Sequence, residues 1–559
     1  MSRLKDSWPW LAVFAAALLL RSWSLDYGLP AVFNSDEPFH VNVAVSFGGG
    51  TLNPGMFKYP TLWMYTLFGA YGVYFLAWSK FALAGAVRGF GELFVWHPYG
   101  FYFIARALAA AFSMGGLALA AVSGEHIGER RTGLWGAALL AVSHTLVVSA
   151  HAAKPDSQMF FLSAAALFFA LRHFARGGSR DLLLAGAACG LAVSTQYTAA
   201  PLATLLPVAW WAGRRRNGSS VPLKVLVAAL AIAAAAFFLG SPFILLDWPS
   251  FVRDMRDQMS VQQLGTPAGL APFQNALSFG GPWVSGGVLA LGAACLLWRD
   301  QPLALVLLVP SAAQALTLAA SPEGDWARYL EGVFPCLALA AGFGVEALLR
   351  SLRRADSRVL QAVVLAVLMG PGFRGSWAFC REIGLPDTRV LAAEWIEKNL
   401  PENTSLLIDQ EHASPMVRKC PEQVRGLLER TKESGHPRWR YYELMLSGHP
   451  GGGFRVSQIL RGAADLHSGG WHSRWSAEGR SVLDVRSGLG AALAAGVEVV
   501  VLSSVGATAE SAPELAAFLS ETASRGTLLA EFVPVPGEVR GPSLRVFRVA
   551  RAKNGVRHG

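Results

Sequence analysis

Apolar segments long enough to cross a lipid bilayer recur along the first two thirds of this chain. They constrain the fold more than any other feature, because a segment inside a bilayer must satisfy its own backbone hydrogen bonds and does so as a helix. Hydrophobic residues make up 53% of the 559 residues and charged residues only 15%, against about 25% charged in soluble domains. The sequence therefore predicts an α-helical polytopic membrane protein.

The first apolar segment, which begins at Trp8, resembles a signal sequence. We expect it to be retained as a membrane helix, because similar runs recur as far as residue 375. The aromatic-rich stretch 61–79 either crosses the membrane or lies along its outer surface. Leaving that stretch aside, the expected spans are 8–25, 101–122, 133–150, 157–172, 182–195, 198–213, 222–240, 283–298, 302–320, 328–347 and 358–375.

The distribution of basic residues decides between the two placements of 61–79. If that stretch does not cross, the basic loops around Arg130, Arg214 and Arg350 fall on the same side as Arg3. This agrees with the rule that loops rich in Lys and Arg stay in the cytosol. We therefore expect about 11 crossings, a cytosolic N-terminus, and the last third of the chain outside.

From residue 385 onward charged residues become frequent and no long apolar run remains. Short β-like segments alternate there with helix-like stretches, which is typical of a small α/β layer structure. The expected strands are Ser405–Ile408, Val497–Ser503 and Leu544–Val549, and the expected helices are Arg389–Asn399 and Ala512–Arg525. The expected domains are a transmembrane domain, 1–384, with outer loops 26–100 and 241–282, and a soluble extracytoplasmic α/β domain, 385–559.

Several common functions are disfavoured by the sequence. The net charge of +10 resides mainly on predicted cytosolic loops, where membrane orientation explains it without nucleic acid. The five cysteines have no metal-ligand spacing, and no Gly-rich phosphate loop, HExxH or GxSxG motif occurs.

Polar residues gather instead at the predicted outer ends of the spans, although they come from distant parts of the sequence. Ionisable groups at membrane depth are costly unless they pair or function, so such a gathering is a functional hypothesis. The alternative is a set of interfacial charges solvated by lipid headgroups. The residues are Asp36, Glu37, His40, Lys58, Tyr59, Arg106, Lys154, Asp156, Gln196, Tyr197, Arg328 and Tyr329.

The order of these motifs resembles that of the GT-C glycosyltransferases of the protein-mannosyltransferase and aminoarabinose-transferase type. The matching stretches are Asp36-Glu37, Phe57–Leu62, Arg106–Leu108, His151–Asp156, Gly190–Thr198, Arg328–Leu330 and Gly541–Arg548. One departure is Lys58-Tyr59-Pro60, which stands where the family has His-Pro-Pro.

The resemblance implies a GT-C membrane fold and a sugar donor linked to polyprenyl phosphate, used outside the cytosol. Such a donor already has a good leaving group, so it needs mainly an activated acceptor and a neutralised phosphate. Asp36 is the candidate general base, giving inversion; alternatively its carboxylate caps the following helix. Glu37 and Asp156 are further candidate catalytic residues that orient neighbours or the acceptor, and plain solvation or an ion pair with Lys154 are the alternatives.

The remaining candidates would bind the donor and the acceptor. Arg328 is the preferred phosphate ligand, because a guanidinium can contact two phosphate oxygens, and Lys58 and Arg106 are second choices. The candidate substrate-binding residues are His40, Tyr59, Lys154, Gln196, Tyr197 and Tyr329. A divalent metal ion at Asp36 or Asp156 stays open.

The expected partners are membrane lipids, a polyprenyl-phosphate sugar, and a glycan, lipid or protein acceptor, in a bacterial inner membrane. The competing class is a lipid or sugar transporter or flippase without transferase activity. That class would predict inverted repeats and charges near the bilayer midplane, and no clear repeat is present.

Overall fold

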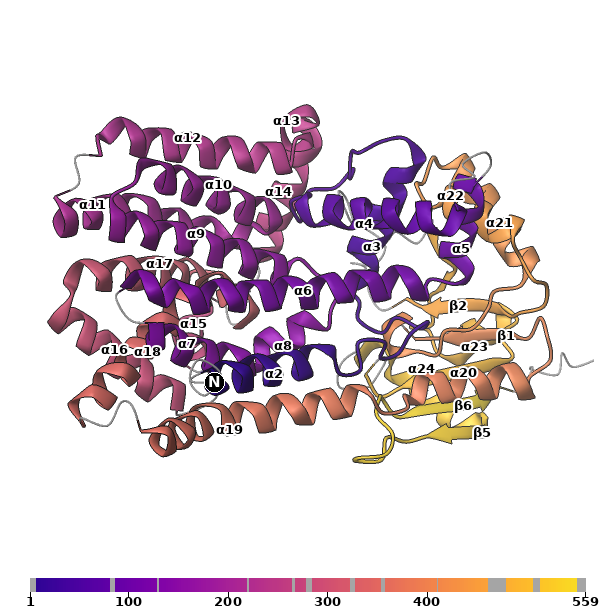
Figure 1. Ribbon diagram of the computed structural model, residues 1–559. Coiled ribbons are helices and arrows are strands. Elements are labelled where there is room, and N and C mark those ends of the chain that lie inside the picture. Colours follow the sequence, from indigo (N-terminus) through magenta and orange to yellow (C-terminus); the bar gives the residue numbers. More distant parts are fainter. Residues whose placement is uncertain are drawn as a thin grey trace, which may run out of the picture. The chain divides into compact units, whose positions relative to one another are not determined.

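The computed structural model describes most of the chain (Figure 1). The described residues are 7–80, 86–127, 130–218, 221–263, 267–277, 284–321, 327–352, 357–409, 411–460, 479–505 and 513–549. They form two compact units. The helical unit comprises Met1–Leu25, Phe39–Tyr71 and Tyr102–Arg381, and the sheet unit comprises Asp26–Pro38, Gly72–Phe101 and Glu382–Gly559.

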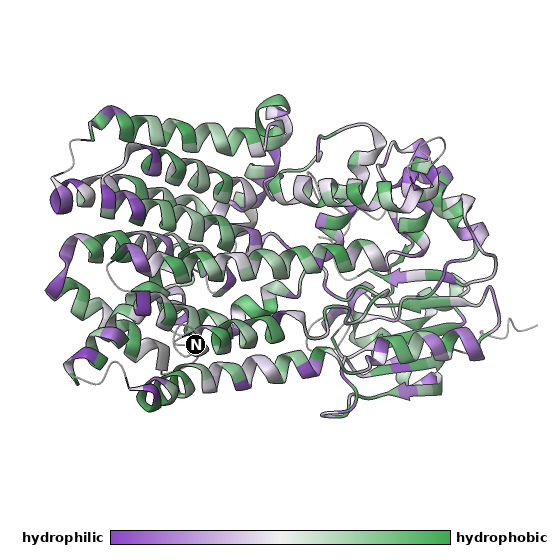
Figure 2. Cartoon of the chain, viewed as in Figure 1, coloured by the Kyte–Doolittle hydropathy of each residue, from purple (hydrophilic) through white to green (hydrophobic). Residues whose placement is uncertain are grey.

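Each expected span coincides with an α-helix or with two consecutive helical segments, most of them green with apolar residues in Figure 2. The helices are α2 (Trp8–Ser22), α6 (Tyr99–Ser123), α7 (Arg130–Val142), α8 (His144–Ala150), α9 (Asp156–Arg176), α10 (Ser179–Thr195), α11 (Leu205–Asn217), α12 (Leu223–Gly240), α16 (Val284–Arg299), α17 (Gln301–Ala319), α18 (Phe334–Ser351) and α19 (Arg358–Ile383). Two 3-10 segments, η3 (Tyr197–Thr204) and η4 (Ala327–Val333), lead into α11 and α18.

Six further helices of the described residues lie in the expected outer loops 26–100 and 241–282. They are α3 (Glu37–Ser46), α4 (Leu62–Ser79), α5 (Ala86–Trp96), α13 (Phe243–Leu246), α14 (Trp248–Gln263) and α15 (Ala271–Leu277).

Among the described residues, 6 helices are long and apolar enough to cross a membrane. They are α6 with its 3-10 extension, α9, α12, α17, η4 with α18, and α19. A seventh results if α7 and α8 count as one broken span. The helix α4, over the stretch 61–79, is not among them, and the count of 11 crossings stays a prediction.

Glycines allow two of these helices to approach each other closely. Gly186 and Gly190 are four residues apart on α10, and a Cβ on either would overlap the backbone carbonyl oxygen of Ala229 or Ala233 on α12. Small residues at this spacing let membrane helices pack backbone to backbone, which the hydrophobic effect alone cannot achieve in lipid.

The expected span 133–150 is not one straight helix. The axes of α7 and α8 differ by 62°, and the last carbonyls of α7 therefore need other donors. The buried Arg21 of α2 supplies them: Nη2 donates to Leu140 O at 2.9 Å and Nη1 to Ala141 O at 2.8 Å. Ser376 Oγ donates to the next carbonyl, that of Val142, at 2.9 Å. This bend precedes the segment that carries Asp156.

The sheet unit contains a 6-stranded sheet of order β3-β2-β1-β4-β6-β5. The strands β3, β2, β1 and β4 run parallel, and β6 is antiparallel to both of its neighbours, β4 and β5. The strands are β1 (Ser405–Ile408), β2 (Arg455–Ile459), β3 (Val482–Leu483), β4 (Val499–Ser503), β5 (Thr527–Phe532) and β6 (Leu544–Arg548). The helices are α20 (Thr388–Asn399), α21 (Pro421–Glu433), α22 (Trp439–Ser447), α23 (Leu489–Ala494) and α24 (Ala516–Arg525).

The central strand β4 is buried on both faces, as expected of a parallel strand covered by helices. Val499 and Val501 belong to one apolar cluster, whereas Val500 and Leu502 belong to a second on the opposite face. The expected strands and helices of this region lie at β1, β4, β6, α20 and, from residue 513 onward, η9 (Pro513–Leu515) and α24; residue 512 lies outside the described residues.

Candidate active site

A cluster of ionisable side chains, of which the two carboxyl groups are buried, lies at the start of α9 and in η4, within the helical unit. Asp156 is the first residue of α9 and is 1% exposed, and Glu331 of η4 is fully buried. Glu331 Oε1 accepts a hydrogen bond from Ser149 Oγ at 2.5 Å. Lys154 and Arg328 are close enough for their positive charges to act on the Glu331 carboxyl, as is the carboxyl of Asp156. Two carboxyl groups and two basic side chains thus lie near one another in the helical unit.

Buried side-chain oxygen atoms of the helical unit that have no hydrogen-bond partner among the described residues include Asp156 Oδ1, Glu331 Oε2 and Gln196 Oε1. A buried acceptor without a donor costs about 1–3 kcal/mol. These three oxygens are therefore suited to accept hydrogen bonds from the hydroxyl groups of a bound molecule.

Arg328, the basic residue of η4 in this cluster, lies beside the ring of Tyr329. Its Nη2 donates to Tyr329 Oη at 3.3 Å, and its guanidinium carbon is 5.0 Å from the centroid of that ring. Its positive charge interacts favourably with the carboxyl of Asp156. The backbone carbonyl of Tyr329 accepts from Gln314 Nε2 at 3.1 Å, which fixes η4 against α17.

The segment that carries Lys58 and Tyr59 is held at both ends. The backbone amide of Phe57 donates to the buried Asp254 at 2.8 Å, and Tyr197 Oη donates to the carbonyl of Phe57 at 3.2 Å. At the other end the amide of Thr61 donates to Ser241 Oγ at 3.0 Å. Lys58 and Tyr59 are half-buried between these anchors.

Two further contacts join this segment to its neighbours. The ring of His40 lies 4.8 Å from that of Tyr59, edge to face. Trp63 Nε1, at the start of α4, donates to Ala153 O at 3.3 Å, within the segment between α8 and α9. Ten of the twelve predicted site residues belong to the helical unit, namely His40, Lys58, Tyr59, Arg106, Lys154, Asp156, Gln196, Tyr197, Arg328 and Tyr329.

Arg106, also in the helical unit, is fully buried on α6 and donates through Nη1 to Leu25 O at 3.0 Å. The ring of His151 is hydrogen-bonded in the same region, with Nε2 2.8 Å from Trp23 O. Both side chains therefore hold the chain where it leaves α2, just before the loop with the acidic pair.

The acidic pair itself belongs to the sheet unit. Asp36 is half-buried, and its backbone amide donates to Asn34 Oδ1 at 3.0 Å. Glu37 begins α3 and is fully buried, with its amide 3.3 Å from Asn34 O. The two carboxylates thus differ in environment: that of Asp36 is the more accessible.

Sequence reasoning did not single out Glu331, Ser149 or Asp254. Glu331 could have been found, because it is the one acidic residue in the otherwise apolar stretch 329–345, where a charge requires an explanation. Ser149 and Asp254 carry no comparable signal, since their partners lie far away in the sequence.

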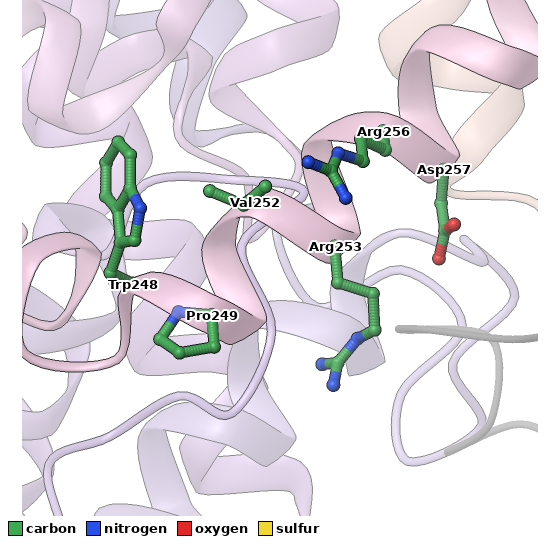
Figure 3. A pocket seen from close by; sticks show the side chains of 6 residues that line it. All are labelled: Trp248, Pro249, Val252, Arg253, Arg256 and Asp257. Atoms are coloured by element: carbon green, nitrogen blue, oxygen red, sulfur yellow. The ribbon is translucent and has the colours of Figure 1, made fainter.

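A cavity of about 460 Å³ opens on α14, in the expected outer loop 241–282 (Figure 3). It is lined by Trp248, Pro249, Val252, Arg253, Arg256 and Asp257. Asp247, just before α14, accepts a hydrogen bond from Asn53 Nδ2 at 2.9 Å, and this bond lowers the pKa of the carboxyl.

Among the described residues, no group of three or more His, Cys, Asp or Glu side chains is arranged to hold a metal ion. The divalent ion suggested for Asp36 or Asp156 stays a prediction.

The chain is similar to known proteins in part of its sequence and in its fold. Residues 100–238 match the sequence model of the family described as dolichyl-phosphate-mannose-protein mannosyltransferase. No curated protein matches the sequence significantly.

The fold is similar to that of ArnT from Cupriavidus metallidurans. In the apo state the TM-score is 0.52 at 13% identity, covering 96% of this chain and 97% of that one. In the complex of ArnT with undecaprenyl phosphate it is 0.51 at 15% identity, covering 96% and 98%. The sequence match over residues 100–238 and the similarity in fold to ArnT therefore agree with the GT-C membrane fold that the motifs predicted.

Proposed function

We propose that this protein moves a sugar from a polyprenyl-phosphate donor to an extracytoplasmic acceptor, which is a glycan, a lipid or a protein, with inversion at the anomeric carbon. The observation that carries the proposal is the cluster of the buried Asp156 and Glu331 with the half-buried Lys154 and Arg328, in an ArnT-like fold. Charges at membrane depth are retained where they bind or react. The undecaprenyl phosphate bound to ArnT supports a lipid-phosphate donor here.

In the proposed reaction, Asp36 accepts the proton of the acceptor hydroxyl as its oxygen attacks the anomeric carbon. The bond from that carbon to the phosphate oxygen breaks, and the polyprenyl phosphate leaves with the electron pair. Arg328 stabilises the developing phosphate charge through its planar guanidinium, with Lys58 and Arg106 as additional cations. The partial exposure of Asp36 supports this assignment, because a base must be reachable by its substrate.

The other polar residues would orient the reactants. Glu37 and Asp156 would hold the acceptor or its neighbours, and the buried oxygens of Asp156, Glu331 and Gln196 would accept hydrogen bonds from sugar hydroxyls. His40, Tyr59, Lys154, Tyr197 and Tyr329 would form the walls of the site.

We further propose that residues 1–384 form the catalytic transmembrane domain, with about 11 crossings, and that 385–559 lie outside the cytosol in a bacterial inner membrane. The concentration of basic residues on the predicted cytosolic loops supports this topology.

The proposal is tested by mass spectrometry of polyprenyl-phosphate sugars in host membranes. A deletion strain is complemented with wild type, Asp36→Asn, or Asp26→Asn, which changes an exposed aspartate of the same loop. One sugar lipid should accumulate in the deletion strain and with Asp36→Asn, but not with Asp26→Asn. Identical lipid profiles in all strains would contradict transferase activity. They would favour a transporter, or a protein that binds the lipid-linked sugar without transferring it.

A further inference from the structure

The loop 26–38, which carries Asp36, belongs to the same compact unit as residues 382–559, although more than 340 residues separate them in the sequence. Two arginines of the distant segment contact aromatic rings of the loop. The guanidinium carbon of Arg389 lies 3.7 Å from the centroid of the Phe33 ring, and that of Arg540 lies 5.3 Å from the Tyr27 ring. Phe33 is only three residues before Asp36.

Both arginines are oriented by a single buried carboxylate. Asp387 receives two parallel hydrogen bonds from Arg389, Nε to Oδ1 at 2.8 Å and Nη2 to Oδ2 at 2.7 Å. Arg540 Nη2 lies 3.4 Å from Asp387 Oδ2. A bidentate pair of this kind fixes the plane of the guanidinium, and Arg389 and Arg540 are only 12% and 14% exposed.

The backbone around Asp387 is joined in the same way. The amide of Thr388 donates to Arg540 O at 2.9 Å, and the amide of Arg540 donates to Pro386 O at 2.9 Å. Gly28 turns the loop with a φ of +70°, and a Cβ there would lie 3.5 Å from Arg540 Nη2. The loop thus passes close to Arg540, whose side chain and backbone are both held at Asp387 and its neighbours.

We propose that Asp387, Arg389 and Arg540 are positioning residues that hold the loop 26–38 and thereby place Asp36 for proton transfer. The part of the chain after residue 382 then contributes to catalysis and not only to acceptor choice. This inference rests on the proposed role of Asp36. A desolvated guanidinium over an aromatic face is attractive and directional, so it can orient the part of the loop, 26–36, that lies in no helix or strand.

The test measures two properties of the purified full-length protein: amide hydrogen exchange in residues 26–38, and the kcat and donor KM of transfer. The variants are Arg389→Gln and Phe33→Leu, with Arg389→Lys and Phe33→Tyr as conservative partners. The control is Arg545→Gln, which breaks an Arg–Phe contact of 5.9 Å on β6.

We expect exchange in the loop to become about tenfold faster in Arg389→Gln and Phe33→Leu. In both, kcat should fall about 10- to 100-fold with the donor KM changed less than about threefold, as for a misplaced reacting group. Phe33→Tyr and Arg389→Lys should recover part of each effect, and the control should change neither.

Unchanged exchange in both variants would overturn the proposal, whatever happens to the transfer rate. Faster exchange with unchanged kcat would overturn it too, because a loosened loop would then not matter for the reaction. If instead Asp36→Asn retains full transfer, the assignment of the base has failed, and the exchange rates still report separately whether the loop is anchored.

Discussion

Removal of Arg21 should destabilise the helical unit by an amount that the structure allows us to work out. The side chain is fully buried and donates to two terminal carbonyls of α7, those of Leu140 and Ala141, and to Ser113 Oγ at 2.8 Å. Arg21→Met keeps the apolar stem but leaves the two carbonyls without these donors. The Ala141 carbonyl left without a donor costs about 1–3 kcal/mol, and the two other lost bonds, to Ser113 and to the Leu140 carbonyl that still accepts from the Ser143 amide at 3.4 Å, cost about 0.5–1.5 kcal/mol each, so the expected loss is roughly 2–6 kcal/mol.

This loss is a large fraction of the roughly 5–15 kcal/mol that a folded protein has. Arg21→Lys keeps a charge but cannot reach both carbonyls with one planar fork, so we expect roughly half the loss. Ser376→Ala removes a single hydrogen bond to the same bend and should cost about 1 kcal/mol.

The assay is reversible unfolding of the purified protein in mixed detergent micelles. Ser22→Ala is the matched control, since the Ser22 hydroxyl is exposed on the same helix and bonds only its own backbone among the contacts seen. The free energy of unfolding should fall in the order control, Ser376→Ala, Arg21→Lys, Arg21→Met. If Arg21→Met unfolds within about 0.5 kcal/mol of wild type, the explanation of the bend is wrong.

Three further predictions follow from other contacts. Gly190→Ala should destabilise the protein, because its Cβ would overlap a backbone carbonyl of α12, whereas Gly287→Ala, with open space around it in α16, should not; thermal unfolding of both compares them. Asp254→Ala removes the acceptor of the Phe57 amide, just before Lys58, and should lower the rate of transfer about 10- to 100-fold. Arg253→Gln, at the exposed neighbouring residue, should lower the rate far less. Equal transfer rates in the two variants would refute this prediction. Glu331→Gln keeps an acceptor for the Ser149 hydroxyl, whereas Glu331→Leu removes it and should destabilise the protein by about 1–3 kcal/mol; equal free energies of unfolding for the two variants would contradict this.

The helices of the membrane part could be predicted because apolar composition alone identifies them. The bend between α7 and α8 could not, since its causes are Arg21 and Ser376, more than 100 residues away on either side. Likewise β4 is rich in β-branched residues, β6 alternates in part and β1 is a short apolar run, whereas β5 is half-exposed and gives no such signal.

For the site, polar residues at the ends of apolar runs predicted twelve side chains, ten of which belong to the helical unit, and their roles stay a prediction. The sequence did not indicate that the loop 26–38 belongs with residues 382–559, because that association depends on two cation–aromatic contacts and a buried carboxylate. Such contacts between distant segments leave no local pattern.

The most direct test of the central claim compares transfer and donor binding in purified Asp36→Asn and wild-type enzyme. A general base contributes about 10²- to 10⁴-fold to a rate, so transfer should fall by at least about 10²-fold while the affinity for polyprenyl phosphate stays within about threefold of wild type. Transfer at the wild-type rate by Asp36→Asn would contradict the account, because no proton acceptor would then be needed at that position.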